Sequence, residues 1–104
     1  MQRVAFLMRI AAGTEQEYER RHQQVWPEMM AELKAAGAHN YSIFRSGLQL
    51  FAYLEVDDLD RYCAYLAESE VAVKWEAQMN DILVRAVDPA TNFPWLLPEV
   101  FHLD

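Results

Sequence analysis

Two segments of this 104-residue chain are apolar at successive positions, and no other feature restricts the fold as much. They are "VAFLMRIA", Val4–Ala11, and "LQLFAYLEV", which ends at Val56. Because successive side chains of a strand point to opposite faces, each segment predicts a strand that is apolar on both faces. A sheet that contains such strands must be covered on both sides.

Local signals next to the first strand predict a helix. Thr14 and Glu17 form the T-x-x-E pattern of a capping box, so the helix should begin at Glu15. Its apolar pattern continues to Gly37, a residue that often ends helices. Pro27 lies inside this span and cannot donate a backbone hydrogen bond. We therefore expect either a kink or a second short helix that begins with Pro27.

The second half of the chain predicts a hairpin, helices and a last strand. Tyr41–Arg45 and Gln49–Val56 flank a short loop and indicate a β-hairpin. The acidic pair Asp57-Asp58 and then Ser69 can cap the helices that follow. The closing stretch "EVFHL", residues 99–103, is expected to be a strand. The order β-α-β-β-α-β is the ferredoxin-like α+β arrangement, and we expect one domain over residues 1–104.

The two-sided strands also predict an oligomer. Helices in this order cover only one face of a four-stranded sheet, and the other face would remain apolar and exposed. A second copy of the chain can cover it with its own sheet. We therefore expect a homodimer, with the two sheets forming a dimeric α/β barrel.

Composition excludes several classes of function. The formal net charge of −7 disfavours binding to nucleic acid or to an anionic membrane surface. The sequence contains no run of 18 apolar residues, so we expect no membrane span. The apolar run before Arg9 is too short for a signal peptide. Cys63 is the only cysteine, and the three histidines lack the spacing of a metal site. We expect a cytoplasmic protein without a bound metal.

The candidate site residues are aromatic side chains and one histidine. With helical spacing, Tyr18 and His22 share a face with Val25 and Met29. His22 is then either a hydrogen-bonded core histidine or a general acid or base, because imidazole titrates near neutral pH. Tyr18 can bind a hydroxylated ligand or the imidazole.

Two further aromatic residues have the same two interpretations. Tyr41, in the hairpin, and Trp75, in the last predicted helix, either pack in the core or form a platform for a sugar. The residue pattern does not choose between the two.

The sequence as a whole resembles the L-rhamnose mutarotases over essentially its full length. The matching stretches are "EYERRHQQVWPE", "GAHNY", "LEV", "KWEAQMND" and "PEVFHLD". The resemblance implies a dimeric ferredoxin-like fold, interconversion of the α and β anomers of L-rhamnose, and no cofactor. Carried over by position, it places the proton donor at His22 and the sugar-binding tyrosines at Tyr18 and Tyr41.

The resemblance also maps a tryptophan pair onto Trp75 and Glu76, and here the chain departs from the family pattern. Glu76 either accepts a hydrogen bond from a sugar hydroxyl or points to solvent. In the implied chemistry, His22 transfers a proton at the ring oxygen or the anomeric hydroxyl while a tyrosine, Glu76 or water serves the other oxygen. A haem-binding or cofactor-free monooxygenase of the same architecture is the alternative, because it would also use a histidine among aromatic side chains.

Overall fold

The computed structural model describes residues 1–84, 87–90 and 93–104. Within these ranges the helices are α1 (Glu15–His22), α2 (Pro27–Ala35), α3 (Leu59–Glu68) and α4 (Glu70–Met79). The strands are β1 (Gln2–Ile10), β2 (Ala38–Ser46), β3 (Gln49–Val56), β4 (Leu83–Val84), β5 (Val87–Asp88) and β6 (Phe93–Pro94).

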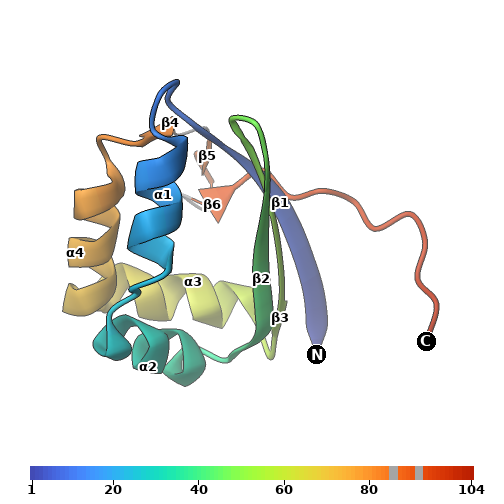
Figure 1. Ribbon diagram of the computed structural model, residues 1–104. Coiled ribbons are helices and arrows are strands. Elements are labelled where there is room, and N and C mark those ends of the chain that lie inside the picture. The colour runs from blue at the N-terminus through green and yellow to red at the C-terminus, as the bar shows by residue number, and fades with distance from the viewer. Residues whose placement is uncertain (85–86, 91–92) are drawn as a thin grey trace.

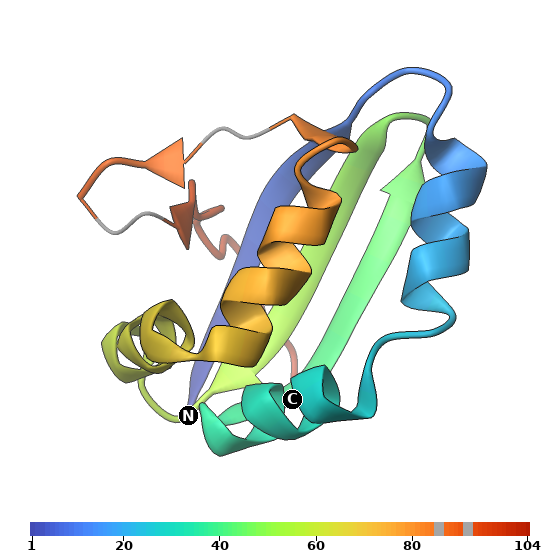
Figure 2. The ribbon, with the colours of Figure 1, turned by 90° about the vertical axis from the view of Figure 1, so that its left-hand side faces the viewer.

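The main sheet has the strand order β2-β3-β1-β4, and β5 and β6 form a separate two-stranded ribbon. All three pairings in the main sheet are antiparallel. Figure 1 shows the sheet edge-on, with the four labelled helices on one side of it, and Figure 2 shows the helices from the front. This order and layering confirm the predicted ferredoxin-like fold.

The apolar side chains of β1 and β3 divide between the two faces of the sheet, as expected. On the helix-covered face, Phe6, Leu50 and Leu54 are at most 3% exposed. On the open face, the paired residues Phe44 and Phe51 are 66% and 43% exposed. The helices therefore bury one face, and the other presents large apolar side chains to solvent in the single chain.

The expected strand at residues 99–103 is wrong. The strand beside β1 is β4, and residues 97–104 contain no strand. The C-terminal segment instead runs away from the sheet on the side opposite the helices (Figure 1). It is attached near its start, where the Leu97 amide donates to the Ala5 carbonyl oxygen at 2.8 Å and Arg3 pairs with Glu99 at 2.9 Å. β4 pairs with β1 only at Arg9 and Ile10, and Leu96 and Leu97 contact the same edge at Phe6 and Ala5, so the chain leaves the sheet before residue 99.

The predicted capping box is also wrong, although α1 begins at Glu15 as expected. The Thr14 hydroxyl donates to the Ala11 carbonyl oxygen at 2.6 Å and makes no cap bond to the helix. The Glu17 carboxylate pairs with Arg20 and Arg21 instead of turning back to the helix start. Charged partners one turn away compete successfully for this carboxylate.

The break at Pro27 takes the second of the two predicted forms. α1 ends at His22, and α2 begins with Pro27 at its first position. Tyr18 and His22 therefore share a helix that does not include Met29. Two predicted caps are confirmed: the Asp58 carboxylate accepts from the Arg61 amide, and the Ser69 hydroxyl accepts from the Ala72 amide.

Candidate active site

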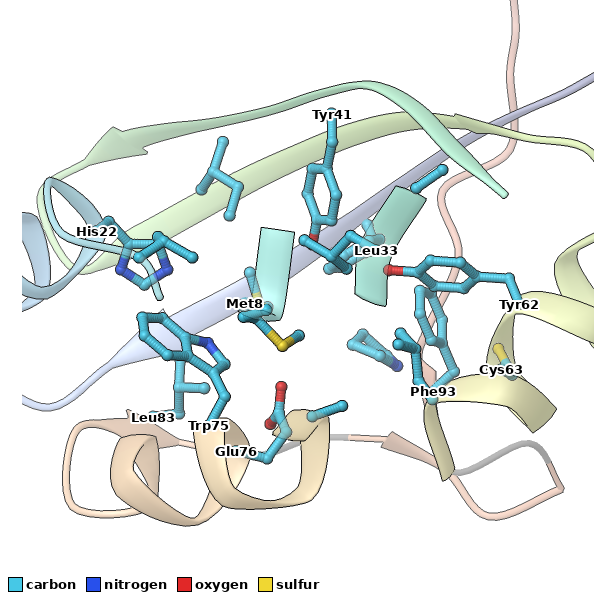
Figure 3. A pocket seen from close by; sticks show the side chains of 18 of the residues that line it. Met8, His22, Leu33, Tyr41, Tyr62, Cys63, Trp75, Glu76, Leu83 and Phe93 are labelled. Carbon is cyan, nitrogen blue, oxygen red and sulfur yellow. The ribbon is translucent and has the colours of Figure 1, made fainter. Parts of the chain in front are cut away.

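A cleft of about 1600 Å³ lies between the helix-covered face of the sheet and the helices. Figure 3 shows side chains from β1, β2, α1, α3 and α4 directed into it. Its lining combines apolar groups with a few polar ones, as is common in small-molecule sites. Its aromatic and polar lining includes His22, Tyr41, Tyr62, Trp75 and Glu76.

His22, at the last position of α1, is held by the preceding turn of the same helix. Its Nδ1 lies 3.1 Å from the Tyr18 carbonyl oxygen. A carbonyl oxygen can only accept, so we assign the proton to Nδ1, which leaves Nε2 as a proton acceptor in the neutral ring. The Tyr18 ring is stacked on the imidazole, with centroids 4.1 Å apart and planes inclined by 23°. Both contacts fix the orientation of the imidazole.

The surroundings of His22 favour its neutral form. Burial lowers the pKa of His22 below its usual value, while the Tyr18 carbonyl and the Glu76 charge act in the opposite direction. Trp75 meets the imidazole edge-on at a centroid distance of 5.6 Å, and Trp26 meets Trp75 in the same way at 5.2 Å. A neutral imidazole beside an indole wall can accept a proton from a ligand hydroxyl.

Tyr41 reaches the cleft because of an irregularity in β2. Ala38 and Ile43 both pair with residues of β3 that face the helices, yet they are separated by an odd number of positions. The register shifts between His39 and Ser42, and Asn40 has a φ of +48°. Such a bulge inserts one residue and reverses the alternation. It turns Tyr41 to the cleft instead of the open face.

Glu76 does not simply point to solvent. Its carboxylate is directed into the cleft from α4 (Figure 3). Its charge raises the pKa values of Tyr18, Tyr41 and Tyr62, in each case after burial as the larger cause. The carboxylate is therefore electrostatically coupled to every tyrosine around the site, and it offers acceptor atoms to a bound ligand.

An arginine next to the catalytic candidate joins α1 to the end of α4. Arg21 Nη1 donates to the Gln78 carbonyl oxygen at 2.7 Å and pairs with Asp81 at 3.0 Å. Its Nε also pairs with Glu17 at 2.9 Å. These contacts fix the distance between the helix that carries His22 and the helix that carries Trp75.

The structure brings four of the five predicted site residues together around one cleft. These are His22, Tyr41, Trp75 and Glu76. Tyr18 is 5% exposed and lies behind the imidazole, where it lines a smaller hollow with His22. Among the described residues, no group of three or more His, Cys, Asp or Glu side chains could hold a metal ion.

Sequence reasoning missed two aromatic contributors to the site. Trp26 directly precedes Pro27, and the helix break there places its indole against Trp75. The Tyr62 ring packs in the core with Cys63 and Leu66, on the apolar side of α3. Nothing local in the sequence indicates that its hydroxyl reaches the cleft.

Comparison with known proteins identifies the family. The model of the L-rhamnose mutarotase family matches residues 3–103. This chain belongs to that family. Two L-rhamnose mutarotases, from Oceanobacillus iheyensis and Opitutus terrae, are 41% and 44% identical to it, and each match covers 100% of both chains. A third, from Listeria monocytogenes serovar 1/2a, is 46% identical and covers 99% of both.

A solved structure of the same family agrees with the fold. The crystal structure of an L-rhamnose mutarotase from Formosa agariphila matches the chain with a TM-score of 0.80 at 37% identity, covering 100% of both chains. These matches give no support to the monooxygenase alternative. No helix in the described part of the chain is long and apolar enough to cross a membrane.

Proposed function

We propose that this protein is an L-rhamnose mutarotase that interconverts the α and β anomers of the free sugar. Membership of the family supports this activity. The observation that carries the chemistry is the arrangement of His22, whose Nδ1 is occupied by the Tyr18 carbonyl while the ring lines the cleft. That arrangement leaves Nε2 to exchange a proton with the sugar.

The reaction requires ring opening, rotation and closure. His22 Nε2 accepts the proton of the anomeric hydroxyl as the bond between C1 and the ring oxygen breaks. The ring oxygen takes a proton from a water molecule in the cleft. The free aldehyde turns about the C1–C2 bond, and the ring oxygen attacks its other face. The water regains its proton, and His22 returns its own to O1, which is the donor role that the resemblance implies.

The tyrosines are better suited to bind hydroxyls than to exchange protons. Burial, with a smaller effect from Glu76, raises the pKa of Tyr18 to about 12. Burial also raises the pKa of Tyr41 well above its usual value. Both phenols therefore stay protonated at neutral pH and are weak acids. In this proposal Tyr41 holds a sugar hydroxyl, Tyr18 orients His22 from behind the imidazole, and the Trp75 indole packs against the sugar's C–H groups.

Saturation-transfer NMR at equilibrium tests the proposal, because exchange between the two H1 resonances of L-rhamnose measures mutarotation directly. The wild type should exchange the anomers faster than buffer. His22→Gln keeps a polar side chain but removes the titrating group, and it should lower the enzymatic rate by roughly 100- to 10,000-fold. His102→Gln, in the C-terminal segment, serves as the matched control. A wild type no faster than buffer contradicts the proposed activity, and a fully active His22→Gln contradicts the role of His22.

The proposal includes a homodimer. The exposed pair Phe44 and Phe51 on the open sheet face supports it, and so does the C-terminal segment, where Val100, Phe101 and Leu103 are 92%, 79% and 79% exposed. Apolar surfaces of this kind are covered in stable assemblies. The cytoplasmic location, the single domain over residues 1–104 and the absence of nucleic-acid binding stay predictions from the sequence.

A further inference from the structure

The Tyr62 side chain is more than a core residue. It is 3% exposed, but its hydroxyl is directed into the cleft (Figure 3). Among the described residues, no protein group forms a hydrogen bond with this hydroxyl. Every side-chain nitrogen or oxygen in this part of the chain that is buried from solvent has a hydrogen-bond partner, so the Tyr62 hydroxyl is not fully buried. The hydroxyl therefore opens onto the cleft, where a bound molecule can pair with it.

Two other polar groups point into the same part of the cleft. The Tyr41 hydroxyl comes from β2 and the Glu76 carboxylate from α4, so three elements contribute (Figure 3). Burial raises the pKa of Tyr62, and the nearby Cys63 and Glu76 raise it further. Burial and, to a smaller extent, Tyr62 raise the pKa of Tyr41. The group thus offers two protonated phenols and a carboxylate, which match the donors and acceptors of neighbouring sugar hydroxyls.

The Tyr62 ring is held in place by its neighbours. Phe93 meets it edge-on at a centroid distance of 6.4 Å and itself packs against Phe6 at 4.9 Å. The start of its helix is capped by Asp58. A hydroxyl on a fixed ring loses little conformational entropy when it pairs with a ligand.

We propose that Tyr62 is a sugar-binding residue that pairs with a hydroxyl on the edge of the pyranose opposite the anomeric carbon. The assignment rests on the proposed function, which places C1 beside His22. Figure 3 shows His22 and Tyr62 at opposite ends of the cleft, with Glu76 between them. The ligand class is a pyranose with free hydroxyls on that far edge.

The test compares two tyrosines of one helix. Tyr62→Phe removes only the hydroxyl in the cleft. Tyr65→Phe makes the same change one turn later, where the hydroxyl donates to Glu32 Oε1 at 3.2 Å and does not line the cleft. Tyr62→Phe should raise the KM for L-rhamnose by roughly 3- to 10-fold and leave kcat within about 2-fold, as expected for one lost hydrogen bond. Tyr65→Phe should leave KM unchanged.

A second measurement separates binding from folding. Thermal unfolding without sugar should give the same Tm for Tyr62→Phe as for the wild type, while the rise in Tm caused by L-rhamnose should be smaller. An unchanged KM and an unchanged rise in Tm would overturn the assignment, and so would a lower kcat at constant KM. If the wild type does not exchange the anomers at all, the proposed function fails instead, whatever the variants do.

Discussion

At the scale of single residues, the chemistry depends on how His22 is held and which charges it meets. The Tyr18 carbonyl occupies Nδ1, burial lowers the pKa of the ring, and the Glu76 carboxylate partly offsets that shift. The first contact selects the tautomer, and the other two set the pH range in which Nε2 can accept a proton. The Glu76 charge thus acts on the pKa of His22.

The pH dependence of kcat/KM follows from these contacts. A base must be unprotonated, so activity should fall as the pH falls through the pKa of His22, below the usual value near 6.5. Glu76→Gln removes the charge that favours the imidazolium and should move this acid limb to still lower pH. Glu70→Gln, in the first turn of the same helix and away from the cleft, should leave the limb in place. Saturation-transfer rates measured over a range of pH locate the acid limb in each variant. A limb that Glu76→Gln leaves in place or raises would contradict the coupling.

At the scale of elements, the bulge in β2 decides which face Tyr41 occupies. Asn40 takes the left-handed backbone conformation, and its Nδ2 donates to Glu55 Oε1 at 2.6 Å. Asparagine tolerates this conformation far better than a β-branched residue does. The alternation of side chains between the two faces therefore shifts by one residue. The cleft gains the Tyr41 phenol, which a regular strand would direct to the open face.

Substitutions at Asn40 should separate the bulge from the side-chain bond. Asn40→Val must strain the backbone or remove the bulge and should lower the free energy of unfolding by about 1–3 kcal/mol. Asn40→Gly keeps the conformation and loses only the bond to Glu55, at a cost of about 1 kcal/mol. Urea unfolding compares the two, and KM should rise more for Asn40→Val because Tyr41 moves. Equal losses for both variants would show that the backbone conformation is unimportant.

At the scale of the whole molecule, the sheet has one covered face and one open face. Phe44 and Phe51 form a cross-strand pair on the open face, and the C-terminal segment extends on the same side (Figure 1). Both features fit a second copy that packs on this side. In the proposed dimer, the helix-covered face carries the cleft and the opposite face carries the interface.

One substitution on the open face should therefore change the oligomeric state. Phe51→Glu would bury a carboxylate in an apolar interface, which costs several kcal/mol without a partner, and should give a monomer. Phe51→Leu keeps the face apolar and should remain a dimer. Light scattering during size-exclusion chromatography measures both masses. A monomeric wild type, or a dimeric Phe51→Glu, would contradict this interface.

Features that depend on neighbours along the chain could be predicted from the amino-acid sequence. The two-sided apolar pattern predicted the strands and the open face, and short-range caps such as Asp58 and Ser69 predicted where helices begin. Pro27 indicated the helix break because its backbone chemistry is local. The stretches "EYERRHQQVWPE" and "GAHNY" pointed to His22 and Tyr41 as site residues, because each stretch is continuous in the chain and carries the resemblance to the family.

Features that depend on residues far apart in the chain required the tertiary structure. The Tyr62 hydroxyl reaches the cleft, and the Trp26 indole contacts Trp75, only because α3, α2 and α4 pack around one cleft. The expected strand at residues 99–103 does not form because β4 and then Leu96 and Leu97 contact the free edge of β1 before the chain leaves the sheet. The capping box failed for a local reason, because Glu17 pairs with Arg20 and Arg21 three and four residues away. The local pattern determines what a segment can form, whereas competition among partners for the same edge, charge or space determines what it does form.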